Sequence, residues 1–110
     1  MNTKLLFAAT MSLGLTGCAM TLPLEGQTAS GDEIFTGTAT GYMDGGGTLE
    51  LTSSKGRECS GTFVYTTGRT GEGTATCDDG QSGTFTFVST GTRGTGKGVL
   101  GGKDFTFTFG

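Results

Sequence analysis

Few residues in this sequence can carry out acid–base or metal chemistry. It contains no histidine, which excludes a Ser/His/Asp triad, a Cys/His pair and the usual zinc ligand sets. Asp78 and Asp79 are adjacent, but they precede Gly80 at an expected turn, where Asp is favoured because its side chain accepts a hydrogen bond from its own turn. Calcium is the alternative ligand for such a pair, although no EF-hand spacing is present. We therefore expect no catalytic residue, no cofactor and no metal site.

The segment 1–17 has the three parts of a secretory signal. Lys4 supplies a positive charge, an apolar run extends over 5–15, and Thr16-Gly17 forms a small-residue exit. The run is too short to span a bilayer as a helix, which takes roughly 20 apolar residues. We expect 1–17 to be a signal peptide that is removed from the mature chain.

The tetrapeptide Leu15-Thr16-Gly17-Cys18 closes that signal. It resembles the lipobox of bacterial lipoproteins, in which an apolar residue and two small residues precede a modified cysteine. The resemblance implies that Cys18 carries diacylglycerol and an acyl chain such as palmitate. Ala19 stands where the family's inner-membrane retention signal has Asp, which implies the outer membrane, on its periplasmic side. The alternative is an ordinary secreted protein whose cysteine lies near the cleavage site by chance.

The other two cysteines then remain as a pair. With Cys18 lipidated, we expect Cys59 and Cys77 to form a disulfide in an oxidising compartment. The bridge would close a loop of about 18 residues and contribute about 3 kcal/mol on the chain-entropy estimate. A metal site is the rival interpretation, but two thiols without histidine fall short of the usual four ligands.

The charge pattern excludes one class of partner. Removal of Lys4 with the signal leaves six of the seven basic residues, against ten acidic ones. The basic residues do not cluster, so the sequence has neither the basic stripe of a nucleic-acid-binding protein nor a polybasic membrane segment. We expect membrane attachment through the lipid on Cys18 and no nucleic-acid binding.

Composition after the signal predicts an all-β domain. Residues 18–31 are polar and small and show no apolar period, so we expect a lipidated flexible tether there. From 32 to 110 glycine and threonine dominate without a helical period, which favours strands. Turn-like clusters separate about seven segments, which predicts one antiparallel meander curled into a roll or barrel. The predicted strands are 33–41, 47–52, 59–65, 71–77, 83–89, 94–100 and 104–109.

Folding neighbouring segments into hairpins places large side chains over small ones. A fold about Gly68 sets Cys59 opposite Cys77 and Phe63 opposite Gly73. The other predicted pairs are Leu49–Gly61, Gly47–Phe63, Phe85–Ala75, Phe87–Gly73, Phe87–Gly96, Leu100–Phe105, Gly98–Phe107 and Gly96–Phe109. A ring lying over a glycine covers backbone that is otherwise bare, so we predict a Phe/Gly core and a solvated, threonine-rich outer face. The predicted large core side chains are Phe35, Leu49, Leu51, Phe63, Tyr65, Phe85, Phe87, Leu100, Phe105, Phe107 and Phe109.

Two further family resemblances are present. Gly71-Glu72-Gly73 recurs as Gly94-Thr95-Gly96, and this spacing is similar to MORN repeats, hairpin units of about 23 residues whose binding properties we do not carry over. The size, lipobox and cysteine pair resemble membrane-bound inhibitors of c-type lysozyme. Ser60-Gly61 with Tyr65 is similar to that family's Ser-Gly inhibitory loop, although this chain has no tryptophan.

These patterns predict a small lipid-anchored protein of the cell envelope with a structural or accessory binding role. Val64, Val88 and Val99 fall on the outer face and form a candidate contact patch for an envelope protein. The inhibitor family supplies the alternative function, a periplasmic inhibitor of a lytic enzyme.

Overall fold

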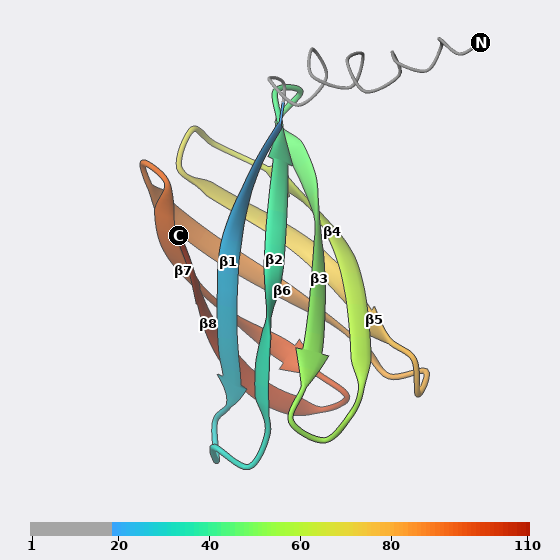
Figure 1. Cartoon of the computed structure of the whole chain (residues 1–110). Coiled ribbons are helices and arrows are strands. Elements are labelled where there is room, and N and C mark those ends of the chain that lie inside the picture. Colours follow the sequence, from blue (N-terminus) through green and yellow to red (C-terminus); the bar gives the residue numbers. More distant parts are fainter. Residues whose placement is uncertain (1–18) are drawn as a thin grey trace, which may run out of the picture.

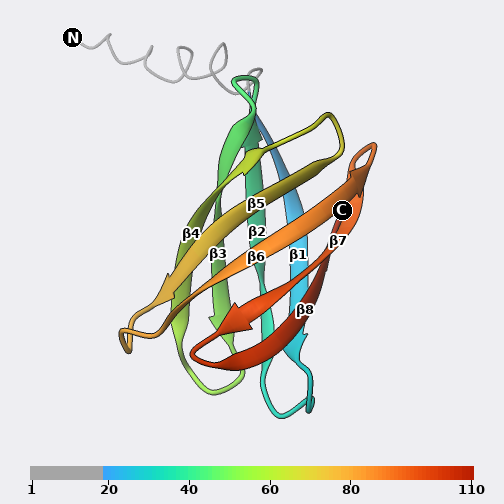
Figure 2. The ribbon, with the colours of Figure 1, turned by 180° about the vertical axis from the view of Figure 1, so that it is seen from behind.

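The computed structural model describes residues 19–110 and shows a closed barrel of antiparallel strands (Figure 1). Each strand pairs with the next along the chain, and β8 pairs with β1 to close the barrel. The predicted all-β meander is confirmed, with eight strands in place of about seven. Figure 2 shows β5, β6 and β7 crossing at a steep tilt to β1–β3. The strands are β1 (Ala19–Thr28), β2 (Ile34–Tyr42), β3 (Gly46–Ser53), β4 (Glu58–Tyr65), β5 (Thr70–Cys77), β6 (Ser82–Thr90), β7 (Arg93–Leu100) and β8 (Lys103–Phe109).

The predicted flexible tether over 18–31 is wrong for the residues that the structure describes. Ala19–Thr28 forms β1, which pairs with β2 on one side and β8 on the other. Its apolar period is short, because only Met20, Leu22 and Leu24 alternate in it and Pro23 stands between the two leucines. The strand forms because it satisfies the open edges of both neighbours, which an unclosed sheet would leave exposed. The β domain therefore begins at 19 rather than 32, while 1–17 and Cys18 lie outside the described residues.

Phenylalanine rings lie against glycines of the preceding strand. A side-chain carbon added at Gly73 would lie 2.5 Å from Cζ of Phe85, its direct cross-strand partner. The ring therefore occupies the volume that a larger residue on the partner strand would need. Four further cross-strand pairs share this arrangement: Gly47–Phe63, Gly71–Phe87, Gly96–Phe107 and Gly94–Phe109.

The predicted register is confirmed for three hairpins and wrong for two. It is confirmed for β3–β4 and β4–β5, and also for Phe87–Gly96 between β6 and β7. It is displaced by two residues in β5–β6 and β7–β8. Because such a shift returns each side chain to the same face, the predicted core survives the error. The observed pairs there are Gly73–Phe85, Gly71–Phe87, Gly98–Phe105, Gly96–Phe107 and Gly94–Phe109.

Glycines with positive φ explain why these two turns differ from the prediction. Gly101 and Gly102 have φ of 59° and 84°, so the β7–β8 turn has only two residues. Gly80 has φ of 90° and lies within the turn at 78–81. A 2.8 Å hydrogen bond from Cys77 N to Gln81 O closes that turn. Each predicted turn was centred one residue too late, which displaces the pairing by two.

The predicted inner face is confirmed as the core of the barrel. Its rings meet edge to face, as in Phe63–Phe87 and Phe85–Phe107, whose centroids are 5.4 Å and 5.5 Å apart. Tyr65 lies at the rim, 39% exposed, with its ring against Phe87. β1 adds Leu24, which is buried and was absent from the predicted set. The most buried members of the predicted set are Phe35, Leu49, Phe85, Phe87 and Leu100.

Alanine at Gly73 should destabilise the barrel, whereas alanine at Gly41 should not. At Gly73 the new methyl group meets backbone and the Phe85 ring, and at Gly41 it meets nothing within 4 Å. We expect Gly73→Ala to lower the free energy of unfolding by about 1–3 kcal/mol, the usual cost of overpacking. Gly41→Ala should stay within about 0.5 kcal/mol of the parent. Urea unfolding monitored by circular dichroism measures both, and equal losses would contradict the ring-on-glycine packing.

Candidate functional site

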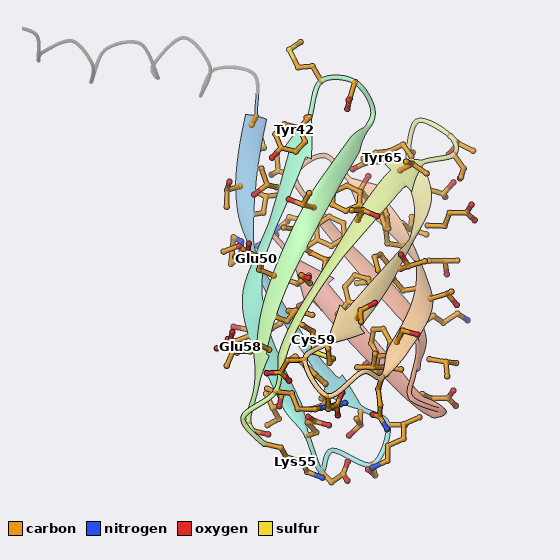
Figure 3. The ribbon with its side chains drawn as sticks, turned by 90° about the vertical axis from the view of Figure 1, so that its right-hand side faces the viewer. Tyr42, Glu50, Lys55, Glu58, Cys59 and Tyr65 are labelled. Atoms are coloured by element: carbon orange, nitrogen blue, oxygen red, sulfur yellow. A yellow bond between two sulfur atoms is a disulfide. The ribbon has the colours of Figure 1, made fainter. Side chains whose placement is uncertain are left out.

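The turns alternate between two ends of the barrel, and the two ends differ in chemistry. The closed end holds the turns at 29–33, 54–57, 78–81 and 101–102. The open end holds the turns at 43–45, 66–69 and 91–92, together with Ala19 and Gly110. In Figure 3, Lys55 marks the closed end, and Tyr42 and Tyr65 mark the open end.

Arg57 seals the closed end with a network of charged side chains. Its Nε and one terminal nitrogen donate to the two carboxylate oxygens of Glu33, both at 2.9 Å. Its other terminal nitrogen donates to Asp79 at 3.1 Å and to Gln81 at 2.7 Å. The Glu33 side chain is only 3% exposed, and the guanidinium lies 5.8 Å from the centre of the Phe35 ring. Two-pronged pairing of this kind compensates for burial of the charges.

Hydrogen bonds hold the carboxylates of Glu33 and Asp32 ionised. The Arg57 guanidinium lowers the pKa of Glu33 below its ordinary 4.5. Hydrogen bonds from Thr28 and Ser30, and then from Lys55, lower the pKa of Asp32. A carboxylate held in its ionised form and already partnered is a poor general acid at neutral pH. The network therefore serves as a structural plug.

The adjacent carboxylates of Asp78 and Asp79 take separate roles. One oxygen of Asp79 accepts the backbone N–H of Gln81 at 3.0 Å, and the other accepts from Arg57. The backbone N–H of Gln81, followed by Arg57, lowers the pKa of Asp79. Asp78 is exposed. Over residues 19–110, no group of His, Cys, Asp or Glu side chains is arranged to hold a metal ion.

The predicted disulfide between Cys59 and Cys77 is present. The two cysteines are cross-strand partners on β4 and β5, and they are 4% and 3% exposed. Figure 3 labels Cys59 in the half of the barrel toward Lys55. They pack with Phe35 and Leu100 toward the closed end. A buried bridge among apolar side chains acts as a structural cross-link, because reagents and partner thiols cannot reach its sulfur atoms. Cys18, the predicted lipidation residue, lies outside the described residues.

The open end contains an apolar recess of about 90 Å³. Five phenylalanines and Tyr65 on β4, β6 and β8 form one side of it, and Leu49 of β3 also lines it. Met20, Leu22 and Leu24 of β1 complete the wall. Sequence reasoning missed this recess because it treated β1 as a tether. The signal that could have found it is the alternation of Met20, Leu22 and Leu24, which places three apolar side chains on one face of a strand.

The outer wall is solvated, as predicted, and does not form the expected valine patch. Val64, Val88 and Val99 are 52%, 47% and 42% exposed. Val88 pairs with Thr95 of β7, four residues before Val99, so the two valines lie roughly 13 Å apart along the strands. Ser60 and Gly61 lie within β4 rather than in a loop. A belt of threonines joins six successive strands and follows the curvature of the barrel: Thr21, Thr40, Thr48, Thr62, Thr74 and Thr84.

Removal of Arg57 should make the protein less stable at pH 7 than at pH 5. In the parent chain the pKa of Glu33 is lowered on folding. Its contribution to the free energy of unfolding is therefore fully present above about pH 4.5 and is lost as the pH falls below that value. In Arg57→Met the buried Glu33 carboxylate loses its paired cation and keeps only the weaker hydrogen bond from Ser53, so burial becomes the largest effect and raises its pKa. Stability should therefore increase as pH falls from 7 to 5. We expect a loss of about 3 kcal/mol at pH 7, measured by urea unfolding.

Arg69→Met provides the matched control at the open end. Arg69 makes only 3.3 Å hydrogen bonds to Ser89 O and to the Thr90 hydroxyl, so its loss should cost about 1 kcal/mol or less. If both variants showed the same loss and the same flat pH profile, the plug would not contribute to folding.

Comparison with known proteins shows a likeness in fold only. No protein-family model and no curated protein matches the sequence. Among solved structures, the chain is similar to a redesigned β-barrel, mFAP1, bound to DFHBI, with a TM-score of 0.67, 16% identity, and coverage of 81% of this chain and 90% of that chain. It is also similar to a de novo designed fluorescence-activating β-barrel, with a TM-score of 0.63, 15% identity, and coverage of 81% of this chain and 88% of that chain. No helix of residues 19–110 is long and apolar enough to cross a membrane.

Proposed function

We propose that this chain is a bacterial lipoprotein of the outer membrane whose barrel faces the periplasm and binds rather than catalyses. The tetrapeptide Leu15-Thr16-Gly17-Cys18, directly after a secretory signal, is the observation that carries the anchor. Processing before Cys18 frees its amine, and lipid on its sulfur and amine holds the protein at the membrane.

The disulfide supports an envelope location. Cys59 and Cys77 form a buried bridge, and such bridges persist in the periplasm and other oxidising compartments, whereas they are rare in the cytosol. The same bridge leaves Cys18 as the remaining cysteine of the three in the sequence.

The apolar recess at the open end is the observation that carries the binding role. It opens at one end of the barrel, and its lining side chains are apolar apart from the hydroxyl of Tyr65. An apolar cavity of about 150 Å³ binds benzene in another protein, so the smaller, open recess of about 90 Å³ suits an alkyl group or part of a ring. The redesigned barrel mFAP1, which is similar in fold, is bound to DFHBI, and this supports a small-molecule ligand as one candidate.

Cys18→Ala should abolish lipidation. The full chain, expressed in a bacterium fed labelled palmitate, should incorporate label, fractionate with the outer membrane and show an acylated amino-terminal peptide by mass spectrometry. The Cys18→Ala variant should lose all three properties because the acceptor sulfur is gone. The double variant Cys59→Ala/Cys77→Ala is the control and should keep the label. Equal labelling of Cys18→Ala and the parent would rule out the anchor.

A bulky side chain at Gly41 should fill the recess. Gly41 lines it, and an added Cβ there meets nothing within 4 Å. In the unlipidated Cys18→Ala chain, titration with toluene should shift the methyl resonance of Met20, which lines the recess, in a saturable way. The Met43 methyl, outside the recess, should not move. Gly41→Leu should abolish the Met20 shift, whereas the exposed turn variant Gly68→Leu should retain it. A shift that survives Gly41→Leu would place the ligand elsewhere.

A further inference from the structure

The chain leaves almost no slack between Cys18 and the barrel. β1 begins at Ala19, which already pairs with Tyr42 of β2. Consecutive Cα atoms lie about 3.8 Å apart, whereas the flexible tether expected over 18–31 would have spanned roughly 20 Å. A lipid on Cys18 therefore lies within one residue of the open end, and the orientation of the barrel relative to that lipid is restricted.

Exposed apolar side chains gather at the same end. Met20, Tyr42, Met43 and Tyr65 are 53%, 47%, 84% and 39% exposed, and all four lie on the open rim. Figure 3 shows Tyr42 and Tyr65 together at that end. Tyrosine combines an apolar ring with a polar hydroxyl and is enriched at the boundary between lipid and water. This rim matches the chemistry of a phospholipid headgroup layer.

The distribution of charge favours the same orientation. The closed end and its flanking residues carry six acidic side chains, namely Asp32, Glu33, Glu58, Asp78, Asp79 and Asp104, against three basic ones. The open-end turns and their flanks carry Asp44 against Arg69 and Arg93. Anionic headgroups attract basic residues and repel acidic ones within a Debye length of the surface. The acidic end is thus directed away from the membrane.

We propose that the open end of the barrel sits directly on the phospholipid surface that holds the Cys18 lipid, with the rim of Met20, Tyr42, Met43 and Tyr65 in the headgroup layer. The inference rests on the proposed lipid anchor. It makes the closed end and the outer wall the surfaces available to periplasmic partners, and it turns the mouth of the apolar recess toward lipid.

Single tryptophans provide the test, because the chain has none. Met43→Trp places a reporter on the open rim, and Ala29→Trp places one in an exposed turn of the closed end. Each full chain is lipidated in a bacterium, purified and reconstituted into phosphatidylethanolamine/phosphatidylglycerol vesicles with or without brominated acyl chains. Bromine should quench Met43→Trp by about half or more, because interfacial apolar groups lie roughly 5–10 Å into the headgroup and acyl boundary. Ala29→Trp should stay as bright as in unbrominated vesicles.

The outcomes distinguish two claims: the seat, meaning contact of the open rim with the headgroup layer, and the anchor, meaning the lipid on Cys18. If mass spectrometry shows no lipid on Cys18 and the protein does not float with vesicles, the anchor fails and the seat fails with it. If the lipid is present but both reporters are quenched equally or not at all, the anchor stands and the seat is wrong. Tyr65→Trp reports a second point on the rim, and a bright Tyr65→Trp beside a quenched Met43→Trp would show a barrel lying on its side, which also overturns the seat.

Discussion

The packing of phenyl rings against bare glycine backbone is the interaction on which the rest of this structure depends. A closed barrel of eight short strands has a narrow interior, and rings from facing positions would compete for the same volume. Here a ring at Phe85 or Phe107 fills the space over a glycine of the preceding strand, Gly73 or Gly96. Large and small residues thus alternate from strand to strand, which lets the rings interdigitate and covers the glycine backbone. Phe63, Phe85 and Phe107 recur at 22-residue spacing, so each later hairpin repeats the packing of a ring over a glycine.

The same barrel wall ends in two chemically different ways. At the closed end, the half-buried Arg57 forms a two-pronged ion pair with the buried Glu33, close to the Cys59–Cys77 bridge. At the open end, the aromatic packing stops at Tyr65 and leaves an apolar recess with an exposed rim. The barrel therefore has one polar end that is closed by side chains and one apolar end that is open. The proposed anchor residue precedes the strand that begins at the apolar end, so chain connectivity and surface chemistry favour the same orientation.

Cross-strand pairs could be predicted from the sequence where a single turn centre is marked clearly between the two strands. The pairs Cys59–Cys77 and Phe63–Gly73 were predictable because Gly68 marks the middle of their hairpin and alternation marks the inner face. The pairings of Phe85 and Phe107 were displaced by two residues, because several adjacent turn-forming residues at 78–81 and 101–103 allow more than one centre. The predicted face of each side chain was still correct, because residues two apart in a strand point to the same side of the sheet.

The amino-acid sequence by itself determined the strand period, the Phe/Gly core, the disulfide partners and the absence of histidine chemistry, because each depends on residue type and short-range spacing. Only the tertiary structure decided that Ala19–Thr28 is a strand, that Arg57 joins Glu33 to Asp79, and that a recess opens at one end. The strand is required by closure between β2 and β8, and the Arg57 network joins three turns that are 22 to 24 residues apart. The Arg57 contacts exist only when the barrel is closed, so no local pattern along the chain records them, whereas β1 left a short local signal in Met20, Leu22 and Leu24.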